Sequence, residues 1–585
     1  MEEDFDWESE TQSRKLQLFT DRHKFTRLFA EYINEDPPRS TILYLHGDGG
    51  NGKSLLLKFL RENCCKSLHP DVWSQLKAKP DAEVAQEIQR VSDWDRGLKP
   101  VPAVLHDFEP LPGGDKRYQH PFDGLLILRR NLANAAQELG YGLKFPFYDY
   151  ACVWYLCKKG KSVQEIRQLF PLSEIAGLIA PLIDVVTENP VGTFGKAVLD
   201  IFAKNLDEKF TLYLQQLGLD EPEIEKIRKL DLDRELIESL PHWFARDLHA
   251  AMAESNKQEK VIKSLPSWFA QDLKALDEKP RRVVLFFDTH EAFWGHQRDG
   301  PEDTFFYMDE WLRRLLKGLK QELGIVVVVV GREPPRWVEA TKFKISPEDL
   351  HTDKVGHLSK ADARVYLQKS GISDAALAEA LIDYASVAPD DAHPFYLGLC
   401  ADLVLAAAKR GIQLSTSDFL NVPTDKSKEL RNRLLRYVDE DIRDAVHALS
   451  ACRAFDRDLY LKLGESLRFS ATSASFRILT RFSFVWRDVQ GRESWYRIHD
   501  LIHRLDYQED NPITRKAHQV LEQHYRDRGD VAEAIYHAAC QKWKQGVEEW
   551  LKVFNNAKDS RDIRLCQILL EIRKELCNLR KKKPS

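Results

Sequence analysis

The sequence predicts a multidomain protein in which an α/β domain, with a parallel sheet and a large helical insertion, is followed by helical modules. Three observations predict this class. Residues 47–54 match the pattern G-x-x-x-x-G-K-[ST] and lie between an apolar run and a helical pattern. Residues 283–287 and 325–330 are uninterrupted apolar runs separated by helical sequence, which is typical of parallel strands covered on both faces. Beyond residue 345 the pattern is mainly helical.

The glycine-rich segment has the context that a phosphate-binding loop (P-loop) requires. Residues 41–46 predict a short buried strand before it, and residues 55–60 predict the start of a helix after it. Glycines let successive backbone N–H groups point at one anion, and the helix N-terminus adds partial positive charge. Lys53 would reach the β- and γ-phosphates of a nucleoside triphosphate, and Ser54 would hold Mg²⁺. The expected nucleotide-binding residues are Gly47, Asp48, Gly49, Gly50, Asn51, Gly52, Lys53, Ser54 and Leu55.

Length and composition exclude several classes of protein. The 585 residues allow three or four domains, and 43% hydrophobic with 30% charged residues argues against global disorder. The net charge of −5 gives no overall bias toward nucleic acid or membranes. Nine scattered cysteines include no CxxC pair, which argues against a zinc ribbon and fits a reducing compartment. The acidic N-terminus lacks a signal core and no run approaches ~20 apolar residues, so a cytoplasmic protein without membrane attachment is expected.

The nucleotide-binding domain is expected over residues 19–345, after a flexible segment at residues 1–18. A helix over residues 19–33 should pack beside the P-loop strand, and residues 101–108 predict a second strand. The interval from about residue 123 to 279 is nearly all helical in pattern. It is longer than a minimal nucleotide-binding domain needs, which indicates a helical insertion.

The insertion contains a repeat. The segment SLPHWFARDL at residues 239–248 returns as SLPSWFAQDL at residues 264–273. Ser-Leu-Pro predicts a helix start, because proline is tolerated in the first turn, where its missing N–H would be unpaired. The repeat is either a duplicated structural helix pair or a partner-binding element, and two copies do not make a solenoid.

The remaining segments predict mainly helices. Residues 305–323 predict one amphipathic helix before the last long strand. A helical lid domain is expected over residues 346–425, and helices followed by a hairpin around residues 489–493 predict a winged helix over residues 426–510. Residues 511–585 predict three or four amphipathic helices with a basic, solvated end.

Polar residues that follow the predicted strands suit phosphate chemistry. Asp288 ends one long strand and would hold Mg²⁺ together with Ser54. Glu291 would orient or deprotonate the attacking water, and Arg332, after the next strand, would sense the γ-phosphate. With Lys53 they form the expected catalytic set. The alternatives are a strand-end cap for Asp288, an ordinary loop carboxylate for Glu291 and a salt bridge to a neighbouring carboxylate for Arg332.

Two weaker signals lie in the later helical modules. Pro394 follows His393 at the start of a predicted helix and could pack on the face of the adenine. His499 precedes Asp500 at the exit of the predicted hairpin. A buried histidine beside an aspartate helix cap is the more frequent explanation for such a pair.

Taken in order, these features resemble the STAND class of P-loop NTPases, the signalling group that includes NB-ARC and NACHT proteins. The resemblance covers roughly residues 19–505. It is carried by residues 47–54, the strand end at 287–291, Gly331-Arg332-Glu333 and Pro394. The triplet Ile498-His499-Asp500 resembles the Met-His-Asp motif of this class, with Ile in place of Met. The segment Phe19-Thr20-Asp21-Arg22 is similar to its Phe-Val-Gly-Arg motif, with Asp in place of Gly. The last match implies a contact of Arg22 near the nucleotide.

The resemblance implies an ATP-binding, slowly hydrolysing switch in signalling or defence. In its ADP-bound resting state the winged helix would cap the nucleotide, with His499 at the β-phosphate. Exchange for ATP, triggered by a ligand or partner protein, would open the chain and favour homo-oligomers. Residues 531–539 look like the start of a tetratricopeptide-type (TPR-like) sensor array. Since no catalytic effector motif is found, the resemblance implies a separate effector protein or one recruited by the insertion.

Two other classes stay open. One is an AAA-type remodelling or initiator ATPase that uses its winged helix on DNA, for which Arg477, Arg481 and Arg487 are available, although Asp488 and Glu493 oppose it. Nucleic acid is therefore a less favoured partner. The other is a scaffold that binds nucleotide without turnover. ATP is preferred to GTP through the resemblance, and no guanine-reading Asn-Lys-x-Asp is seen in the expected place.

Overall fold

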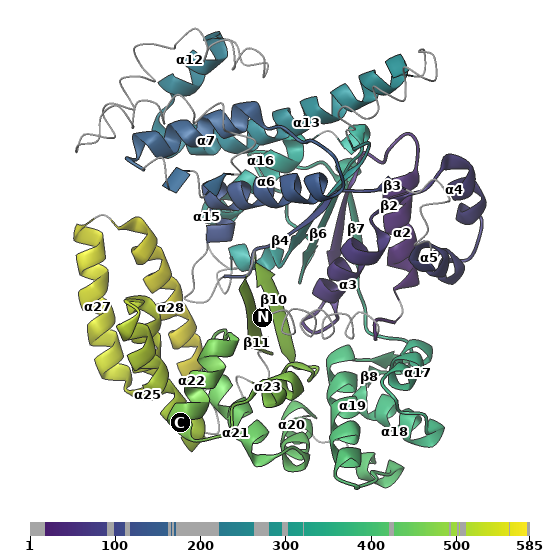
Figure 1. Ribbon diagram of the computed structural model, residues 1–585, viewed down its shortest axis with the longest axis vertical. Coiled ribbons are helices and arrows are strands. Elements are labelled where there is room, and N and C mark those ends of the chain that lie inside the picture. Colours follow the sequence, from purple (N-terminus) through teal and green to yellow (C-terminus); the bar gives the residue numbers. More distant parts are fainter. Residues whose placement is uncertain are drawn as a thin grey trace.

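The core of the protein is a five-stranded, fully parallel sheet (Figure 1). The computed structural model describes residues 18–20, 22–90, 99–110, 117–161, 165–166, 169–170, 221–262, 280–294, 302–319, 321–420, 426–490, 493–499, 502, 511–560 and 562–581. The strands, in their order across the sheet, are β4 (Ala103–Asp107), β5 (Val283–Asp288), β6 (Ile325–Gly331), β1 (Ile42–His46) and β7 (Leu350–Lys354).

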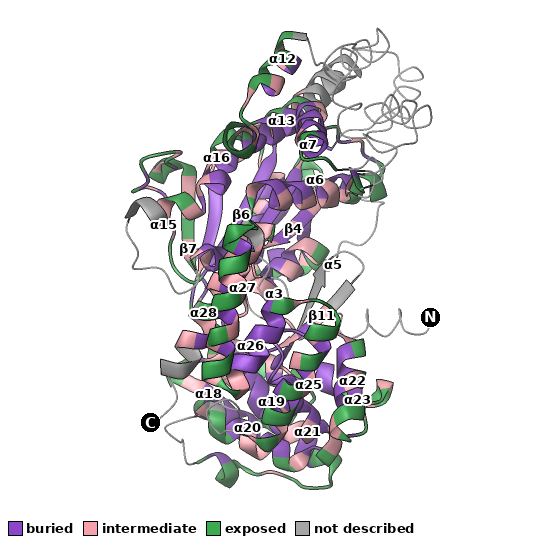
Figure 2. Cartoon of the chain, turned by 90° about the vertical axis from the view of Figure 1, so that its left-hand side faces the viewer, coloured by how far each residue is buried: buried purple, intermediate pink, exposed green. Residues whose placement is uncertain are grey.

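Helices cover both faces of this sheet (Figure 1). Successive residues of a strand point to opposite faces, so Leu43 and Leu45 pack in one apolar core while Tyr44 packs in the other. The strands β5 and β6 are buried throughout in the interior (Figure 2), which explains why their sequences are continuously apolar. The helices on the Leu43 face include α2 (His23–Asn34), α3 (Lys53–Phe59) and α5 (Asp81–Arg90), and those on the other face include α6 (Pro121–Glu138), α7 (Pro146–Lys158), α13 (Ile237–Ile262) and α16 (Glu310–Gly318).

The strand β7 was not predicted. Its sequence, Leu-His-Thr-Asp-Lys, lacks an apolar run because β7 is an edge strand with half-buried and exposed residues. It pairs in parallel with the P-loop strand β1. The sheet therefore extends to Lys354, beyond the domain boundary expected at residue 345.

The described part of the region between β4 and β5 is mainly helical. Besides α6, α7 and α13 it contains α12 (Glu221–Lys229) and the π-helical turn η4 (Leu232–Leu236). The expected helix start at the first repeat copy is wrong: α13 begins at Ile237, so Pro241 lies inside it, following helical turns that begin in η4. The second copy, residues 264–273, lies outside the described residues.

The helix expected over residues 305–323 is interrupted. The structure has α15 (Glu302–Met308), then Asp309 in a non-helical conformation, then α16. The side chain of Asp309 is buried and accepts hydrogen bonds from other elements. An amphipathic pattern cannot reveal this break, because it depends on partners distant in sequence.

The chain beyond the sheet forms one helical body with a hairpin. The elements are α17 (Lys360–Lys369), α18 (Ala375–Ala385), the short strands β8 (Ser386–Ala388) and β9 (Asp391–Ala392), α19 (Pro394–Lys409), α20 (Lys426–Tyr437), α21 (Glu440–Leu449), α22 (Arg457–Leu467), α23 (Ser473–Thr480), and the hairpin strands β10 (Val485–Gln490) and β11 (Glu493–Ile498). One apolar core runs from Leu358 to Leu521. The lid (residues 346–425) and the hairpin module (residues 426–510) expected from the sequence therefore share a core.

Four helices complete the described chain, as the amphipathic pattern predicted: α25 (Pro512–Asp527), α26 (Val531–Gln541), α27 (Trp543–Asp559) and α28 (Ile563–Lys581). The helices α26, α27 and α28 pack around a separate small core (Figure 1), whereas α25 buries Ala517 and Leu521 in the core of the lid and hairpin. A charge cluster joins them to the hairpin module: Arg453, before α22, contacts Glu533 of α26 at 2.6 Å and Glu575 of α28 at 2.8 Å. Glu533 is fully buried, so these ions are held away from water.

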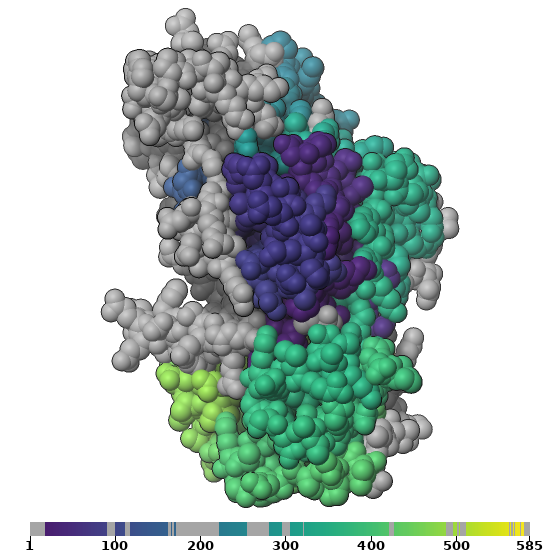
Figure 3. All heavy atoms as spheres, turned by 90° about the vertical axis from the view of Figure 1, so that its right-hand side faces the viewer, coloured from purple at the N-terminus to yellow at the C-terminus, as the bar shows by residue number. Residues whose placement is uncertain are grey.

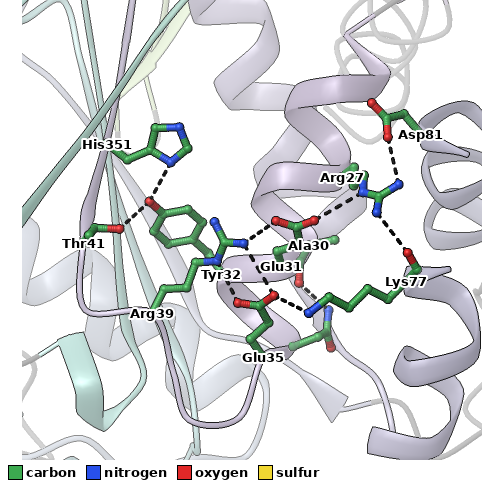
Figure 4. A network of polar contacts seen from close by, with 11 residues as sticks. Arg27, Ala30, Glu31, Tyr32, Glu35, Arg39, Thr41, Lys77, Asp81 and His351 are labelled. Carbon is green, nitrogen blue, oxygen red and sulfur yellow. Dashed lines mark hydrogen bonds and ion pairs between the residues drawn. The ribbon is translucent and has the colours of Figure 1, made fainter. Parts of the chain in front are cut away.

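A polar network fixes α2 at the amino ends of the strands (Figure 4). Arg39 contacts Glu31 at 2.5 Å and Glu35 at 2.8 Å, and Lys77 reaches Glu35 at 2.7 Å. An open hollow of about 580 Å³ lies beside it, lined by Pro38, Arg39, Ser40, Thr41, Leu350, His351 and Thr352. It lies at the end of β1 and β7 opposite the P-loop. In the described part of the chain, no helix is both long and apolar enough to cross a membrane.

Candidate functional site

The P-loop connects β1 to α3 as the sequence predicts. Gly50 and Gly52 have φ of +87° and +79°, which other residues rarely adopt, so these positions require glycine. The Lys53 ammonium folds back and donates hydrogen bonds to the carbonyls of Gly47 at 2.6 Å and Asp48 at 2.9 Å. Ser54 and Leu55 follow in the first turn of α3.

The structure brings the four expected catalytic residues together. Burial lowers the pKa of Lys53, and the neighbouring carboxylates of Glu291 and Asp288 counteract this while Arg332 adds to it. Charges influence one another in this way only at close range. The order of strands explains the proximity: β6 lies between β5 and β1, so Arg332 emerges between Asp288 and the P-loop.

Asp288 is buried at the end of β5, with a side chain suited to a cation. One carboxylate oxygen accepts the Thr289 N–H at 2.8 Å, and the other has no hydrogen-bond partner among the described residues. Burial, with a further contribution from the Asp107 carboxylate, raises the pKa of Asp288 to about 7, although the Ser54 side chain acts in the opposite direction. Two carboxylates and a hydroxyl at one point match the oxygen donors that Mg²⁺ prefers, so these residues fit a divalent cation.

Glu291 and Arg332 are paired with each other. Arg332 Nε lies 2.9 Å from one Glu291 oxygen, and the Arg332 backbone N–H donates to the other at 3.1 Å. This is the salt bridge weighed as the alternative for Arg332. The guanidinium is half exposed, with 51% of its side chain accessible, so it can turn toward another anion. Its sensing role and the role of Glu291 toward water stay predictions.

Arg22 contacts backbone carbonyls around the P-loop. It donates to Asn51 at 3.1 Å, Gly356 at 2.8 Å and His357 at 3.3 Å. The Asn51 amide in turn donates to the Val355 carbonyl at 3.1 Å. Arg22 thereby ties the P-loop to the segment after β7, and a direct nucleotide contact stays a prediction.

The lid lies directly on the P-loop. A side chain added at Gly50 would meet the His393 ring at 2.9 Å and Phe395 at 3.3 Å. His393 caps α19, with its ring accepting the Phe395 N–H at 3.2 Å, and Pro394 is the first residue of that helix. The Phe395 ring stacks on His499 at 4.1 Å. Figure 3 shows the same adjacency at the surface, where residues of the lid adjoin those of the N-terminal part.

The charge state of this contact follows from burial. Burial, together with the nearby His357 and His499 rings, lowers the pKa of His393 to about 4. His393 is therefore neutral at pH 7. Its role as helix cap requires this, because only an unprotonated ring nitrogen can accept the Phe395 N–H. Asp500, which follows His499, lies outside the described residues.

The hairpin also contacts the sheet edge. Arg497 of β11 pairs with Glu109, which follows β4, at 3.0 Å, and donates to the carbonyl of Pro110. In Figure 1 the hairpin accordingly points at the carboxyl end of the sheet. We call this pair the Arg497–Glu109 contact.

The sequence did not identify every residue at this site. Asp107 ends β4, as Asp288 ends β5, and lies opposite it in the register of the two strands. The strand predicted over residues 101–108 extended one residue too far, so the strand-end rule did not select Asp107. Phe395 and Arg497 carry no sequence signal of their own, since their importance comes from segments more than 100 positions away.

Comparisons with known proteins add a likeness of fold. No family model and no curated protein matches this sequence. The chain is similar to the solved structure of a Signal Transduction ATPase with Numerous Domains (STAND) protein with a tetratricopeptide repeat sensor from Pyrococcus horikoshii, at 10% identity and a TM-score of 0.38. The match covers 95% of this chain and 58% of the other, so the chain spans less than two thirds of that protein's length.

Proposed function

We propose that the chain is a STAND-type ATPase switch that binds ATP and ADP, hydrolyses ATP slowly and rests in a closed state. The observation that carries this proposal is the stack over the P-loop, in which Gly50 packs on His393 and Phe395, and Phe395 packs on His499. A metabolic ATPase needs open access to its phosphates, whereas here the body formed by the lid and hairpin packs on the P-loop at Gly50, with Asp48 and Gly49 left exposed. Such a cover suits regulated nucleotide exchange.

Each residue of the site has a separate role in nucleotide binding or hydrolysis in this proposal. The P-loop amides and Lys53 would bind the phosphates, and Ser54, Asp288 and the neighbouring Asp107 would hold a Mg²⁺ ion, which would supply charge neutralisation of the phosphates. Glu291 accepts a proton from the attacking water when it is free of Arg332. Arg332 leaves Glu291 when the γ-phosphate offers its oxygens as a stronger partner. The ion pair seen here is then the resting arrangement.

Activation in this proposal requires the cover to move. The lid and hairpin hold the P-loop through the Gly50 stack and the Arg497–Glu109 contact. ATP–Mg²⁺ in place of ADP favours the opened chain, which exposes surfaces for homo-oligomerisation, and a trigger ligand or protein sets the balance. We propose signalling or defence as the setting, with a separate effector protein.

The test begins with the protein as purified. It is denatured, the released nucleotide is identified by chromatography, and mass in solution is recorded before and after adding ATP–Mg²⁺. The proposal expects retained ADP on a monomer that assembles with ATP. The Lys53→Ala variant should show neither property.

Two results would overturn the proposal. Rapid turnover by a preformed ring without retained nucleotide would favour a remodelling ATPase. Tight binding of ATP with no turnover over hours would favour a scaffold.

A further inference from the structure

A buried polar network lies behind the carboxyl ends of the strands. The Tyr44 hydroxyl is 2.9 Å from His290 Nδ1, and His290 Nε2 is 3.1 Å from Asp309. Asp309 also accepts from Trp337 Nε1 at 2.7 Å and from Arg313 Nε at 3.0 Å. All five side chains are at most 2% exposed. We call these residues the Tyr44–Asp309 network.

The network joins the segments that carry the catalytic residues. Tyr44 belongs to the strand that leads into the P-loop, and His290 lies between Asp288 and Glu291. A side chain at Gly331, directly before Arg332, would collide with the Tyr44 hydroxyl. Three strand ends are thereby held to Asp309, which lies in the break between α15 and α16.

The geometry leaves His290 little freedom. Its Nε2–H donates to Asp309, so Nδ1 accepts from the Tyr44 hydroxyl, an assignment that satisfies every group in the network. The rings of Trp294 and Trp337 lie against it, with centroids at 4.8 Å and 5.1 Å. The preceding residue, Thr289, has φ of +56°, a conformation that a β-branched residue adopts only when its surroundings impose it.

Asp309 is ionised in this setting. Burial alone would raise its pKa, but the hydrogen bond from His290, the positive charge of Arg313 and the hydrogen bond from Trp337 outweigh burial and hold the pKa below its usual value. Arg313 also donates to the backbone carbonyls of Lys342 and Phe306. The anchor of the network is therefore a fixed charge that is tied to α15, α16 and the loop after β6.

We propose that the Tyr44–Asp309 network positions Glu291 and Arg332 for the γ-phosphate, and that His290 is a positioning residue acting through the strained turn that carries Glu291. The inference rests on the proposed function, since it concerns the same nucleotide site. It goes beyond that function in one respect. The helices α15 and α16, which lie outside the P-loop motifs, would influence catalysis through Asp309.

A matched control exists in the same domain. Arg129 and Asp149 form a second buried ion pair, with hydrogen bonds of 2.9 Å and 2.6 Å between α6 and α7. The hydrogen bonds given for Asp149 run to Arg129, between two helices and not to a strand end. Asp149→Asn and Asp309→Asn therefore both disturb a buried arginine–aspartate pair, but the structure connects only Asp309 to the site.

The experiment compares wild type, Asp309→Asn, Tyr44→Phe and Asp149→Asn. Measurements are kcat and KM for ATP, the ratio of affinities for ATPγS and ADP, and the thermal midpoint. For Asp309→Asn we expect kcat to fall about tenfold or more with KM within about threefold, because misplacing a catalytic group costs rate more than binding. The affinity ratio should also shift, by about fivefold, since Arg332 discriminates the γ-phosphate.

Tyr44→Phe should lower kcat by about threefold to tenfold with little loss of stability, because it removes one hydrogen bond and keeps the ring. Asp149→Asn should lower the thermal midpoint without changing kcat or the affinity ratio. The inference is overturned if kcat and the affinity ratio are unchanged in Tyr44→Phe and Asp309→Asn. It is also overturned if Asp149→Asn changes kcat and the affinity ratio as they do. A wild-type protein that binds no nucleotide would instead overturn the proposed function. If the wild-type protein binds nucleotide but does not hydrolyse ATP, the ratio of affinities for ATPγS and ADP alone tests the positioning role of the Tyr44–Asp309 network.

Discussion

At the scale of single residues, the buried carboxylate of Asp288 indicates a binding site for a cation. A buried carboxylate oxygen without a partner among the described residues is rare in folded proteins, because its desolvation is not compensated. Asp107, its register partner, makes the local charge still less favourable. A divalent cation removes both penalties at once, and the Ser54 hydroxyl supplies a further oxygen. These three residues are electrostatically unfavourable as a group on their own and favourable once they bind a cation.

A pair of variants separates binding from chemistry at this site. Lys53→Ala should abolish nucleotide binding, because the P-loop loses its cation. Asp288→Ala should spare binding and stop hydrolysis, with kcat falling by about a hundredfold or more, since Mg²⁺ is then poorly held. Fluorescent ADP titration and phosphate release measure the two effects. Asp71→Ala, at an exposed carboxylate of α4 (Pro70–Lys77), is the control. Normal turnover in either site variant would refute the assignment.

The amino end of α19 is the element through which the lid contacts the P-loop. Its N-cap is a histidine where serine, threonine, aspartate or asparagine is usual. The histidine gives this end a ring that packs against Gly50, together with the ability to titrate. Because the fold keeps that ring neutral, protonation opposes the docked helix end.

This predicts a pH dependence with a definite sign. The pKa of His393 is lowered to about 4, so between pH 6.5 and 4 the unfolded chain binds more protons at this residue than the folded one. Its contribution to the free energy of unfolding is constant above about pH 6.5 and falls as the pH drops toward 4. His393→Asn keeps a capping side chain without a titrating group. Denaturant midpoints at pH 7 and pH 5 should therefore differ less in the variant, and equal differences would contradict the prediction.

The elements that sequence could predict are those whose environment is uniform along their length. The strands β5 and β6 are buried throughout, so each is a continuous apolar run, and the P-loop motif located β1 and α3. The edge strand β7 has no such signature. The break at Asp309 was also beyond prediction, since its cause is contacts with His290 and Trp337 that exist only in the fold.

The candidate site was predictable to a similar extent. Lys53, Asp288, Glu291 and Arg332 were found because parallel strands end at one edge, so residues after each strand meet there. The pairing of Glu291 with Arg332 depends on side-chain conformation, which strand order does not determine. His499 was selected by its resemblance to a family motif, whereas its actual partner, Phe395, carries no motif.

At the scale of the whole molecule, the lid with the hairpin packs on the sheet domain at the P-loop, and the C-terminal helices join the hairpin module at the Arg453 cluster. The lid and hairpin share one apolar core, so they are expected to move together. Their polar contact with the sheet edge is the Arg497–Glu109 contact, whose side chains are 20% and 42% exposed. Ion pairs with such exposure are weak and therefore easily exchanged.

Weakening this contact should favour opening. Arg497→Gln is expected to raise the ADP dissociation rate by about threefold to tenfold, since partly exposed pairs contribute roughly 1 kcal/mol. Small-angle scattering should show a larger radius of gyration after ADP is removed. Arg364→Gln breaks an exposed pair with Glu379 inside the lid and is the control. Unchanged ADP release and size in Arg497→Gln would contradict a closing role for the hairpin.

The Arg453 cluster has a mechanical consequence. Glu533 and Arg453 lie away from water, so separating α26 and α28 from the hairpin module would leave a buried charge without its counterion, which is strongly unfavourable. We therefore expect the hairpin module and the helices α26 and α28 to move as one rigid unit. In that case a tilt of the C-terminal helices would reach the P-loop through His499 and Phe395, which packs on Gly50.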